Sequence, residues 1–344
     1  MLAPLSLALR SRRRRPTPWA ELADLSGLPP EGLADAVREL ARRGFVIESQ
    51  PHLGLSLLDV PAALDGTEVA WDLPVSRIGC RLRCVETTTS TNDLAWEAVE
   101  RNPGEADGLA LFADYQSGGR GRRRSRWLAP PSSSVLCSVI LWVPPGTLEG
   151  AVLTRMAAVA AAEAIEDQCD LPVGIKWPND IVLEDRKVGG ILVETRSQGG
   201  SAAPVVVGIG INCSQGPAAF PPAIRSRAAS LAMLGAQVDR TLLARSLLVR
   251  LDRAWALATG PDGAAKAREG AARRCRTLGK QLTVTEGGAQ HAGEVVDLDE
   301  EYGLVLRLAG GALRRFPAMT SHVVSEGGGP GGPGKKGGEN AARS

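Results

Sequence analysis

The sequence predicts an α+β protein with a helical N-terminal domain, a central mixed-sheet domain and a small C-terminal β-barrel. Its 344 residues exceed the length that one hydrophobic core usually serves, which favours several domains. Apolar residues recur with helical spacing before Gly44, strands alternate with helices from Arg81, and short strands separated by glycine turns follow Arg273. The expected divisions are residues 1–64, 65–78 (a linker), 79–272, 273–325 and 326–344 (a disordered Gly-rich tail).

The N-terminal domain has the outline of a winged helix-turn-helix. Residues 19–23 and 31–43 are predicted helices separated by a Ser-Gly-Leu-Pro-Pro turn, and residues 45–48 and 53–58 form a predicted hairpin. The second helix mixes acidic and basic residues, which is unfavourable for reading DNA bases. The preceding arginine run at 12–15 is compatible with a contact to phosphates or the minor groove, and equally with a solvated basic tail.

Strands and helices alternate through the central part of the chain. Pro178 interrupts one of these strands because proline cannot donate to a β-ladder, so its polar neighbours can turn towards a site. The last of them ends in Gly-x-Gly without the third glycine and the helix of a dinucleotide-binding fingerprint, which excludes that class. The predicted strands are 82–86, 109–114, 134–142, 174–183 and 205–212, the helices 93–101, 152–167 and 241–258, and the barrel strands 281–285, 292–298, 303–308 and 312–316.

Residues 116–127, QSGGRGRRRSRW, are the most distinctive stretch of the chain. Five arginines offer bidentate donors to phosphate or carboxylate, and three glycines let the backbone approach a ligand closely. Ordering about ten residues costs roughly 1–2 kcal/mol each, whereas one charge-assisted hydrogen bond returns about 1.5–3 kcal/mol. We therefore expect an anion-binding loop that becomes ordered over a polyanionic ligand; a solvated basic turn is the alternative.

Composition excludes several classes of protein. The six cysteines show no CxxC spacing and there are only three histidines, which argues against a Cys/His metal site and favours reduced thiols. The apolar N-terminal run precedes its arginines, the reverse of a secretory signal. No segment offers the roughly eighteen uninterrupted apolar residues of a membrane span. We therefore expect a cytoplasmic protein without a membrane partner.

Five short motifs in this order resemble the biotin protein ligases. They are STN at 90–92, GRGRR at 119–123, KWPND at 176–180, KVGGILVE at 187–194 and GIGIN at 208–212. With the N-terminal winged helix, they resemble the bifunctional ligases that also repress the biotin operon. The resemblance implies a catalytic domain of the biotin/lipoate ligase type and an SH3-like barrel.

The resemblance also implies a two-step reaction that uses ATP and Mg²⁺, with biotin as the substrate. The biotin carboxylate attacks the α-phosphate to give biotinyl-5′-AMP, and a lysine of a biotin carboxyl carrier protein then attacks this mixed anhydride. The resemblance further implies two other partners, operator DNA through residues 12–60 and a second copy of the chain as a homodimer.

The family pattern, carried over residue by residue, implies a catalytic trio. Lys187 and Arg122 would neutralise the carboxylate and the phosphate, and Asp180 would orient or deprotonate the incoming lysine. No residue is assigned to the metal. The implied biotin-binding residues are Ser90, Thr91, Asn92, Gln116, Gly119, Arg120, Arg122, Lys187 and Gly190, and the nucleotide-binding residues are Arg122, Trp127, Lys176, Asn179, Gly210 and Asn212.

Two departures and two alternatives accompany this interpretation. Arg124 stands where the family loop commonly has a glycine, and the stretch after Phe316 lacks an arginine with which some relatives reach the nucleotide. One alternative is a lipoate or octanoyl ligase of the same fold, against which the arginine loop and the barrel argue. The other is a transcriptional regulator that senses biotinyl-AMP with little ligase activity, against which the intact catalytic trio argues.

Overall fold

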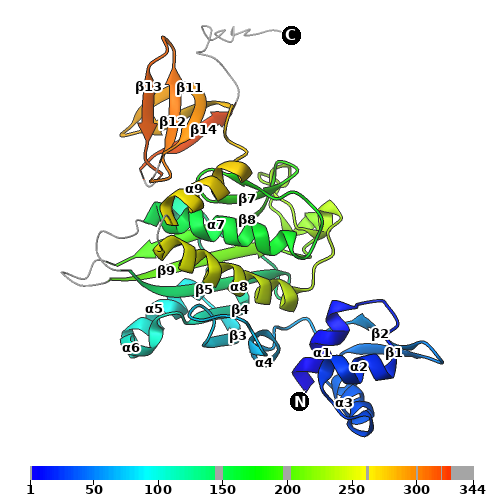
Figure 1. Cartoon of the computed structure of the whole chain (residues 1–344). Helices are drawn as coiled ribbons and strands as arrows, with labels where there is room; N and C mark the ends of the chain where they lie inside the picture. The colour runs from blue at the N-terminus through cyan, green and yellow to red at the C-terminus, as the bar shows by residue number, and fades with distance from the viewer. Residues whose placement is uncertain are drawn as a thin grey trace, which may run out of the picture. The chain divides into compact units, whose positions relative to one another are not determined.

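Three helices and a hairpin open the chain in the computed structural model, which describes residues 2–143, 150–196, 203–260, 263–299, 301–318 and 320–326 (Figure 1). Buried leucines from all three helices, among them Leu5, Leu22 and Leu33, form one core beneath the hairpin. The elements are α1 (Leu2–Ser11), α2 (Trp19–Ser26), α3 (Pro30–Arg42), β1 (Val46–Gln50) and β2 (Gly54–Asp59).

The helix α1 corrects the expectation of a basic arm that precedes the first helix. Leu5 and Leu9 recur at helical spacing and are fully or almost fully buried, so this short apolar run is a core helix. The arginines that follow are also tied down, since Arg12 pairs with Glu21 at 2.7 Å and Arg13 pairs with Asp59 at 2.7 Å.

The segment expected to be a linker, residues 65–78, contains a short helix and runs along a long one. Helix α4 (Gly66–Ala70) lies within it, and the long helix is α8 (Arg240–Thr259). The Arg245 guanidinium donates to the carbonyls of Glu68 and Trp71 at 2.8 and 2.6 Å. Asp252 accepts from the backbone N–H groups of residues 76–78 at 2.8–2.9 Å. Side chains of α8 thus satisfy the backbone groups of the segment.

The first part of the chain also contains a seven-stranded sheet, and it is mixed, as predicted (Figure 1). Its order is β3-β4-β5-β9-β8-β7-β6; β3 and β4 are parallel and every other neighbouring pair is antiparallel. The strands are β3 (Leu82–Thr88), β4 (Ala110–Gln116), β5 (Ser134–Val143), β6 (Gly174–Lys176), β7 (Asp180–Leu183), β8 (Arg186–Thr195) and β9 (Ala203–Asn212). The predicted strand 174–183 is therefore a hairpin, β6 and β7, which turns around Pro178.

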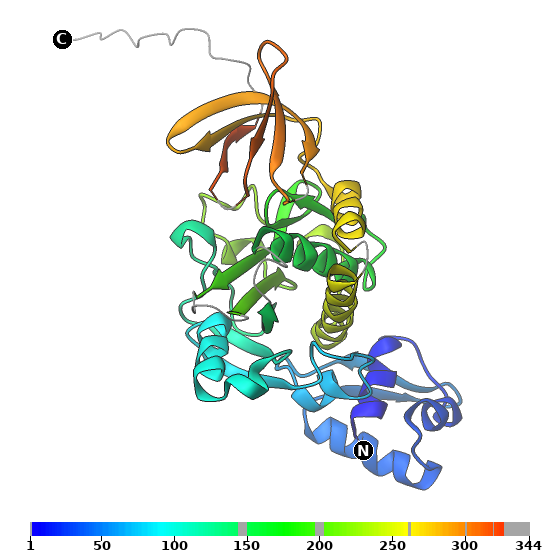
Figure 2. The same cartoon turned by 60° about the vertical axis from the view of Figure 1, so that its left-hand side comes forward.

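Alternating side chains of the sheet face two helical layers. Phe112 and Val207 belong to the core under α7 (Gly150–Glu166) and α8, and Leu111 and Val206 to the smaller core under α5 (Thr91–Arg101). Figures 1 and 2 both show α7 and α8 side by side on the sheet. The remaining helices are α6 (Pro103–Ala106), the unpredicted α9 (Gly263–Arg274) and the short turns η1 (Arg122–Arg124), η2 (Pro217–Ala219) and η3 (Ala232–Leu234).

The chain divides into two compact units between Arg276 and Thr277. The second unit holds an antiparallel sheet of order β13-β12-β11-β10-β14 around Leu282, Leu304 and Phe316. Its strands are β10 (Gln281–Glu286), β11 (Ala289–Leu298), β12 (Leu304–Leu308), β13 (Leu313–Phe316) and β14 (His322–Glu326). Four were predicted and β14 was not; the barrel stays a prediction, and the Gly-rich tail lies outside the described residues.

None of the helices in the described part of the chain is long and apolar enough to cross a bilayer.

Candidate functional site

The predicted site residues lie at the start of α5, at the end of β4 or in the loop after it, and on strands β6, β7, β8 and β9 or the turns that join them. The first group lies at the N-terminus of α5. Ser90 caps this helix, because its Oγ accepts from the N–H of Asn92 at 3.3 Å. Gln116 Oε1 accepts from the N–H and the Oγ1 of Thr91 at 2.7 and 3.1 Å, which joins the end of β4 to α5.

Ser138 in β5 completes this polar group, although no sequence motif indicated it. Its fully buried hydroxyl is 2.7 Å from Thr91 Oγ1 and 2.6 Å from Asn92 Oδ1. The signal was a hydroxyl in the middle of a strand whose other residues, apart from Ser134 at its start, are apolar. Asn92 Nδ2 is buried without a hydrogen-bond partner in the described part of the chain, and Gly208 leaves the room that this amide fills. An unsatisfied buried donor suits a ligand that brings an acceptor.

The indole of Trp127 lies on a floor made by two predicted glycines. A Cβ atom at Gly210 would lie 2.7 Å from two indole carbons, and one at Gly190 would lie 3.5 Å from the ring and 3.2 Å from Lys187 Nζ. The ammonium of Lys187 is 5.8 Å from the ring centroid. Trp127 Nε1 is buried and has no partner among the described residues. The glycines therefore provide a flat, sterically open surface for a planar group beside a cation.

The predicted catalytic trio is held close to this floor. Lys187 Nζ lies 2.5 Å from Asp180 Oδ1, and both side chains are about one-third exposed (36% and 30%). Arg122 Nη1 is 3.5 Å from Asn179 Oδ1. Burial lowers the pKa of the Arg122 guanidinium, and the carboxylate of Asp180 opposes that shift. The site thus combines two cations with one carboxylate, in partial contact with solvent.

The turn between β6 and β7 fixes Asn179 in place. Its Nδ2 donates to the carbonyl of Ile191 at 2.9 Å, and Ile191 N–H donates back to its carbonyl at 3.0 Å. Lys176 is the register partner of Asp180 across the hairpin, so it lies at the same end of the sheet.

The arginine loop is a small hairpin of its own. Trp127 N–H donates to the Gly119 carbonyl at 2.9 Å, and Gly121 N–H donates to the Ser125 carbonyl at 2.8 Å. Within it Arg123, and not the family's glycine position at Arg124, adopts the left-handed conformation, with φ at 56°. The side chain of Arg124 lies outside the described part, and ordering of the loop over a ligand stays a prediction.

The guanidinium of Arg120 is engaged by two carboxylates. Its Nη2 lies 2.7 Å from Asp93 Oδ1 and 3.3 Å from Glu194 Oε1. Arg120 was predicted to bind biotin, and neither carboxylate was a predicted site residue.

Asn212 is also bound within the protein. Its Nδ2 donates to the carbonyl of Ala229 at 3.0 Å, and its Oδ1 accepts from Gln215 at 2.7 Å. The segment that includes Ala229 is also bound to Lys187 through the backbone. The N–H of Lys187 donates to the carbonyl of Arg227 at 2.7 Å, and the N–H of Ala229 donates to the carbonyl of Lys187 at 2.9 Å. Residues 227–229 therefore form a wall between Lys187 and Asn212, which no sequence motif indicated.

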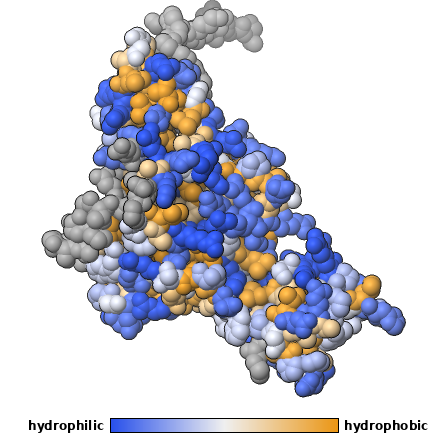
Figure 3. Space-filling model, viewed as in Figure 1, coloured by the Kyte–Doolittle hydropathy of each residue, from blue (hydrophilic) through white to orange (hydrophobic). Residues whose placement is uncertain are grey.

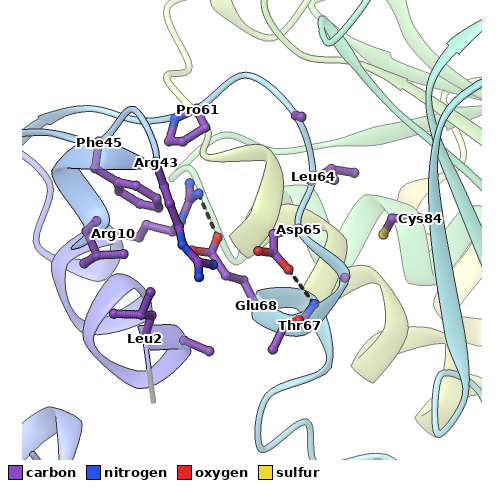
Figure 4. Close-up of a pocket in the computed structure, with 14 residues that line it drawn as sticks. Leu2, Arg10, Arg43, Phe45, Pro61, Leu64, Asp65, Thr67, Glu68 and Cys84 are labelled. Atoms are coloured by element: carbon purple, nitrogen blue, oxygen red, sulfur yellow. Dashed lines mark hydrogen bonds and ion pairs between the residues drawn. The ribbon is translucent and has the colours of Figure 1, made fainter. Parts of the chain in front are cut away.

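A separate cavity of about 660 Å³ lies among α1, α3 and the segment before α4 (Figure 4). None of the predicted site residues lines it. Figure 4 shows Arg10 directed at Glu68; this buried guanidinium lies 2.8 Å from Glu68 and 2.7 Å from Asp239. Cys84 also lines the cavity, and burial, together with the charge of Asp114, raises the pKa of its thiol to about 12. This thiol is therefore not a nucleophile at neutral pH.

The sequence of this chain is similar to a known protein family and to individual ligases. The Biotin/lipoate A/B protein ligase family matches residues 84–212. The bifunctional ligase/repressor BirA of Bacillus subtilis is 30% identical over 236 residues, which are 68% of this chain and 72% of the relative. The biotin–[acetyl-CoA-carboxylase] ligase of Mycobacterium tuberculosis is 32% identical over 241 residues, which are 67% of this chain and 84% of the relative.

A solved structure shares this fold. The biotin protein ligase from Aquifex aeolicus in complex with biotin and ATP aligns with a TM-score of 0.59 at 26% identity, covering 71% of this chain and 98% of that chain. The predicted resemblance is confirmed: this chain belongs to the biotin/lipoate protein ligase family.

Proposed function

We propose that this chain is an ATP-dependent biotin protein ligase, which makes biotinyl-5′-AMP and transfers the biotinyl group to a lysine of a biotin carboxyl carrier domain. The observation that carries the proposal is the cluster of Lys187, Asp180 and Arg122 beside the glycine floor under Trp127. The Mycobacterium relative, which is named as a biotin ligase, and the solved biotin protein ligase with biotin and ATP support the choice of substrate.

In the first step, an oxygen of the biotin carboxylate attacks the α-phosphorus of ATP, and the bond to pyrophosphate breaks. Two anions must approach each other, so the site has to supply positive charge at the reacting atoms. Lys187 and Arg122 would provide that charge. Magnesium would arrive with the nucleotide phosphates, because Mg²⁺ usually combines phosphate and water ligands with few protein oxygens; Asn179 is the neutral oxygen donor that the cluster offers.

In the second step, the carrier lysine attacks the carbonyl carbon of biotinyl-5′-AMP, an amide bond forms, and AMP leaves. A lysine amine, with a pKa of about 10.4, is mostly protonated at neutral pH. Asp180 would accept the proton or orient the amine, and its partial exposure gives the incoming lysine access to it.

Binding roles follow the same geometry. Ser90, Thr91, Asn92 and Gln116 would surround the polar ring of biotin, and the free Asn92 Nδ2 would donate to its carbonyl. Gly119 would present its backbone to the same ligand. On the nucleotide side, Trp127 would stack on adenine over Gly190 and Gly210, and Lys176 would approach the phosphates. Because the amide of Asn212 is already engaged, we assign it to holding residues 227–229 as a wall of the nucleotide site.

A secondary role as a biotin-responsive repressor is the weaker part of the proposal. It rests on the name of the Bacillus relative and on the order of three helices and a hairpin, for which we propose the winged helix type. The cations of α3 are paired internally, Arg38 with Asp35 and both Arg42 and Arg43 with Glu39. Figure 3 shows hydrophilic and apolar groups mixed over this part of the surface. We therefore expect residues 12–60 to bind operator DNA only weakly, whether the chain is a monomer or a homodimer.

Biotin-dependent exchange of labelled pyrophosphate into ATP tests the main proposal. The purified chain should catalyse exchange with biotin, and only at background level with lipoate or octanoate. Exchange with lipoate or octanoate in place of biotin would instead support the lipoate/octanoyl ligase reading. No exchange together with tight, salt-sensitive operator binding would support the regulator that senses biotinyl-AMP.

A further inference from the structure

Three charged side chains, Asp93, Arg120 and Glu194, form a cluster beside the proposed site, which we call the loop latch. Arg120 Nη2 lies 2.7 Å from Asp93 and 3.3 Å from Glu194. Each carboxylate has its second oxygen held by a neutral donor: Thr89 Oγ1 donates to Asp93 Oδ2 at 2.8 Å, and Trp96 Nε1 donates to Glu194 Oε2 at 3.0 Å. Both carboxylates are therefore oriented from two sides.

The loop latch connects the three segments that carry the proposed ligand contacts. Asp93 lies in the first turn of α5, directly after residues 90–92. Glu194 lies on β8, the strand that also carries Lys187 and Gly190. Arg120 lies in the hairpin 119–127, between the backbone contact of Gly119 and the cation of Arg122. A single guanidinium thus joins the loop to both walls of the site.

Charge balance shows what Arg120 does not do. Two carboxylates surround this one guanidinium, so its charge is already compensated within the protein. Arg196, the other cation that acts on Asp93, is itself paired with Glu100. The hydrogen bond from Arg120 is the main cause that lowers the pKa of Asp93, which keeps this carboxylate ionised at neutral pH. The positive charge for the carboxylate and the phosphate therefore comes from Lys187 and Arg122.

We infer that Asp93 and Glu194 are positioning residues that act through Arg120 and hold the arginine loop closed over the activated intermediate. This inference rests on the proposed function for the identity of the intermediate, but the closure itself is a property of the chain alone. Substitution of either carboxylate by its neutral amide should open the loop, let the adenylate escape faster and raise the KM for biotin. The rate of the first step at saturating biotin should change little, because both carboxylates bind Arg120, whereas Lys187 is bound by Asp180.

The variants for the test are Glu194→Gln and Asp93→Asn, with Glu97→Gln as the matched control on the exposed face of α5. Glu194→Gln is the cleaner of the two, because Asp93 also stabilises the N-terminus of α5 through the helix dipole. An Arg120→Met background shows whether the carboxylates act through Arg120, and Arg120→Lys shows whether a charge alone restores their effect.

Trypsin digestion of the ligand-free proteins tests the loop latch independently of any activity, since the loop contains several arginines at which trypsin cleaves. Cleavage within residues 120–126 should be about threefold to fivefold faster in Glu194→Gln, the size expected for a partly exposed ion pair. Equal cleavage in Glu194→Gln, Asp93→Asn and the control would overturn the inference. So would a carboxylate effect that persists undiminished in the Arg120→Met background.

Release of labelled biotinyl-5′-AMP from the protein, measured by rapid filtration without acceptor, then tests the consequence for the intermediate. The escape rate and the KM for biotin should rise together by about threefold to fivefold, with kcat for exchange nearly unchanged. A fall in kcat without faster escape would contradict the positioning role. Faster tryptic cleavage in a protein that shows no biotin-dependent exchange would leave the loop latch standing and refute the proposed ligase function instead.

Discussion

The substitution Asp180→Asn separates the two proposed chemical steps. Asp180 is the only carboxylate recorded within ion-pair distance of Lys187 among the described residues, at 2.5 Å. The amide keeps the size and a hydrogen-bond acceptor but cannot take a proton. We expect transfer of biotin to the carrier lysine to fall far more than formation of the adenylate.

The structure supports a magnitude for each effect. The Lys187–Asp180 pair is about one-third exposed (36% and 30%), and partly exposed ion pairs contribute roughly 0.2–1 kcal/mol. Asp180→Asn should therefore change the unfolding equilibrium constant by less than about fivefold. It should also change the rate of the first step, which depends on Lys187 and Arg122, by less than about fivefold. Loss of a general base costs about 10²–10⁴-fold. The two ranges do not overlap, so the ratio of the two rates identifies the role.

The assay measures the steps separately. Pyrophosphate exchange reports the first step, and preformed labelled biotinyl-5′-AMP mixed with carrier domain reports the second. Hydroxylamine in place of the carrier lysine gives a nucleophile that is largely unprotonated at neutral pH, and it should restore most of the rate. In Asp180→Asn the transfer rate should rise with pH as the acceptor amine, with a pKa of about 10.4, loses its proton.

The exposed Glu184 in the next turn gives the control variant, Glu184→Gln, which should match the unmodified chain in both steps. Transfer by Asp180→Asn at the unmodified rate would refute the assignment of Asp180 as the base. An equal loss of exchange and transfer would show that Asp180 serves the first step as well.

The remaining predictions concern the glycine floor and the segment along α8. Gly210→Ala would place a methyl group 2.7 Å from the Trp127 indole and displace the ring. Overpacking of this kind costs about 1–3 kcal/mol, so the KM for ATP in pyrophosphate exchange should rise about tenfold. The control Gly216→Ala should have no effect, because a Cβ atom there meets nothing within 4 Å. An unchanged KM would show that the indole does not contribute to the nucleotide site. Asp252→Ala removes the acceptor for three backbone N–H groups, each worth about 1–3 kcal/mol when left unpaired, and should lower the thermal midpoint clearly. Burial acts to raise the pKa of Asp252, but the hydrogen bonds from residues 76–78 outweigh burial and lower the pKa. The stabilisation of the folded chain by the Asp252 carboxylate is therefore present above the ordinary pKa of about 3.9, and it is lost as pH falls through the lowered pKa of the folded state. If the thermal midpoints of Asp252→Ala and the unmodified chain differed by the same amount at neutral pH and in strong acid, this account would be contradicted.

Local pattern was sufficient for most of the regular structure. The helix over residues 241–258 and the strand over 205–212 were predicted almost in full, because their apolar periodicity is strong and the same neighbours along the chain decide it. The predictions that failed had weak local signals. Helix α1 is a short apolar run for which no helix was predicted, and β14 contains only two apolar residues, Val323 and Val324. Both elements depend on partners elsewhere in the chain.

The sequence alone determined the chemical inventory of this protein: the arginine loop, the lysine and aspartate of the proposed catalytic trio, and the glycines that flank Trp127. Residue identity and motif order are local properties, so they are legible without coordinates. The tertiary structure alone decided which charged and polar groups meet. Arg10 meets Asp239 and Arg120 meets Glu194 across long stretches of chain, and Ser138 reaches Thr91 from another strand. Only folding sets these distances, because each pair is joined by packing of elements whose contacts no local pattern encodes.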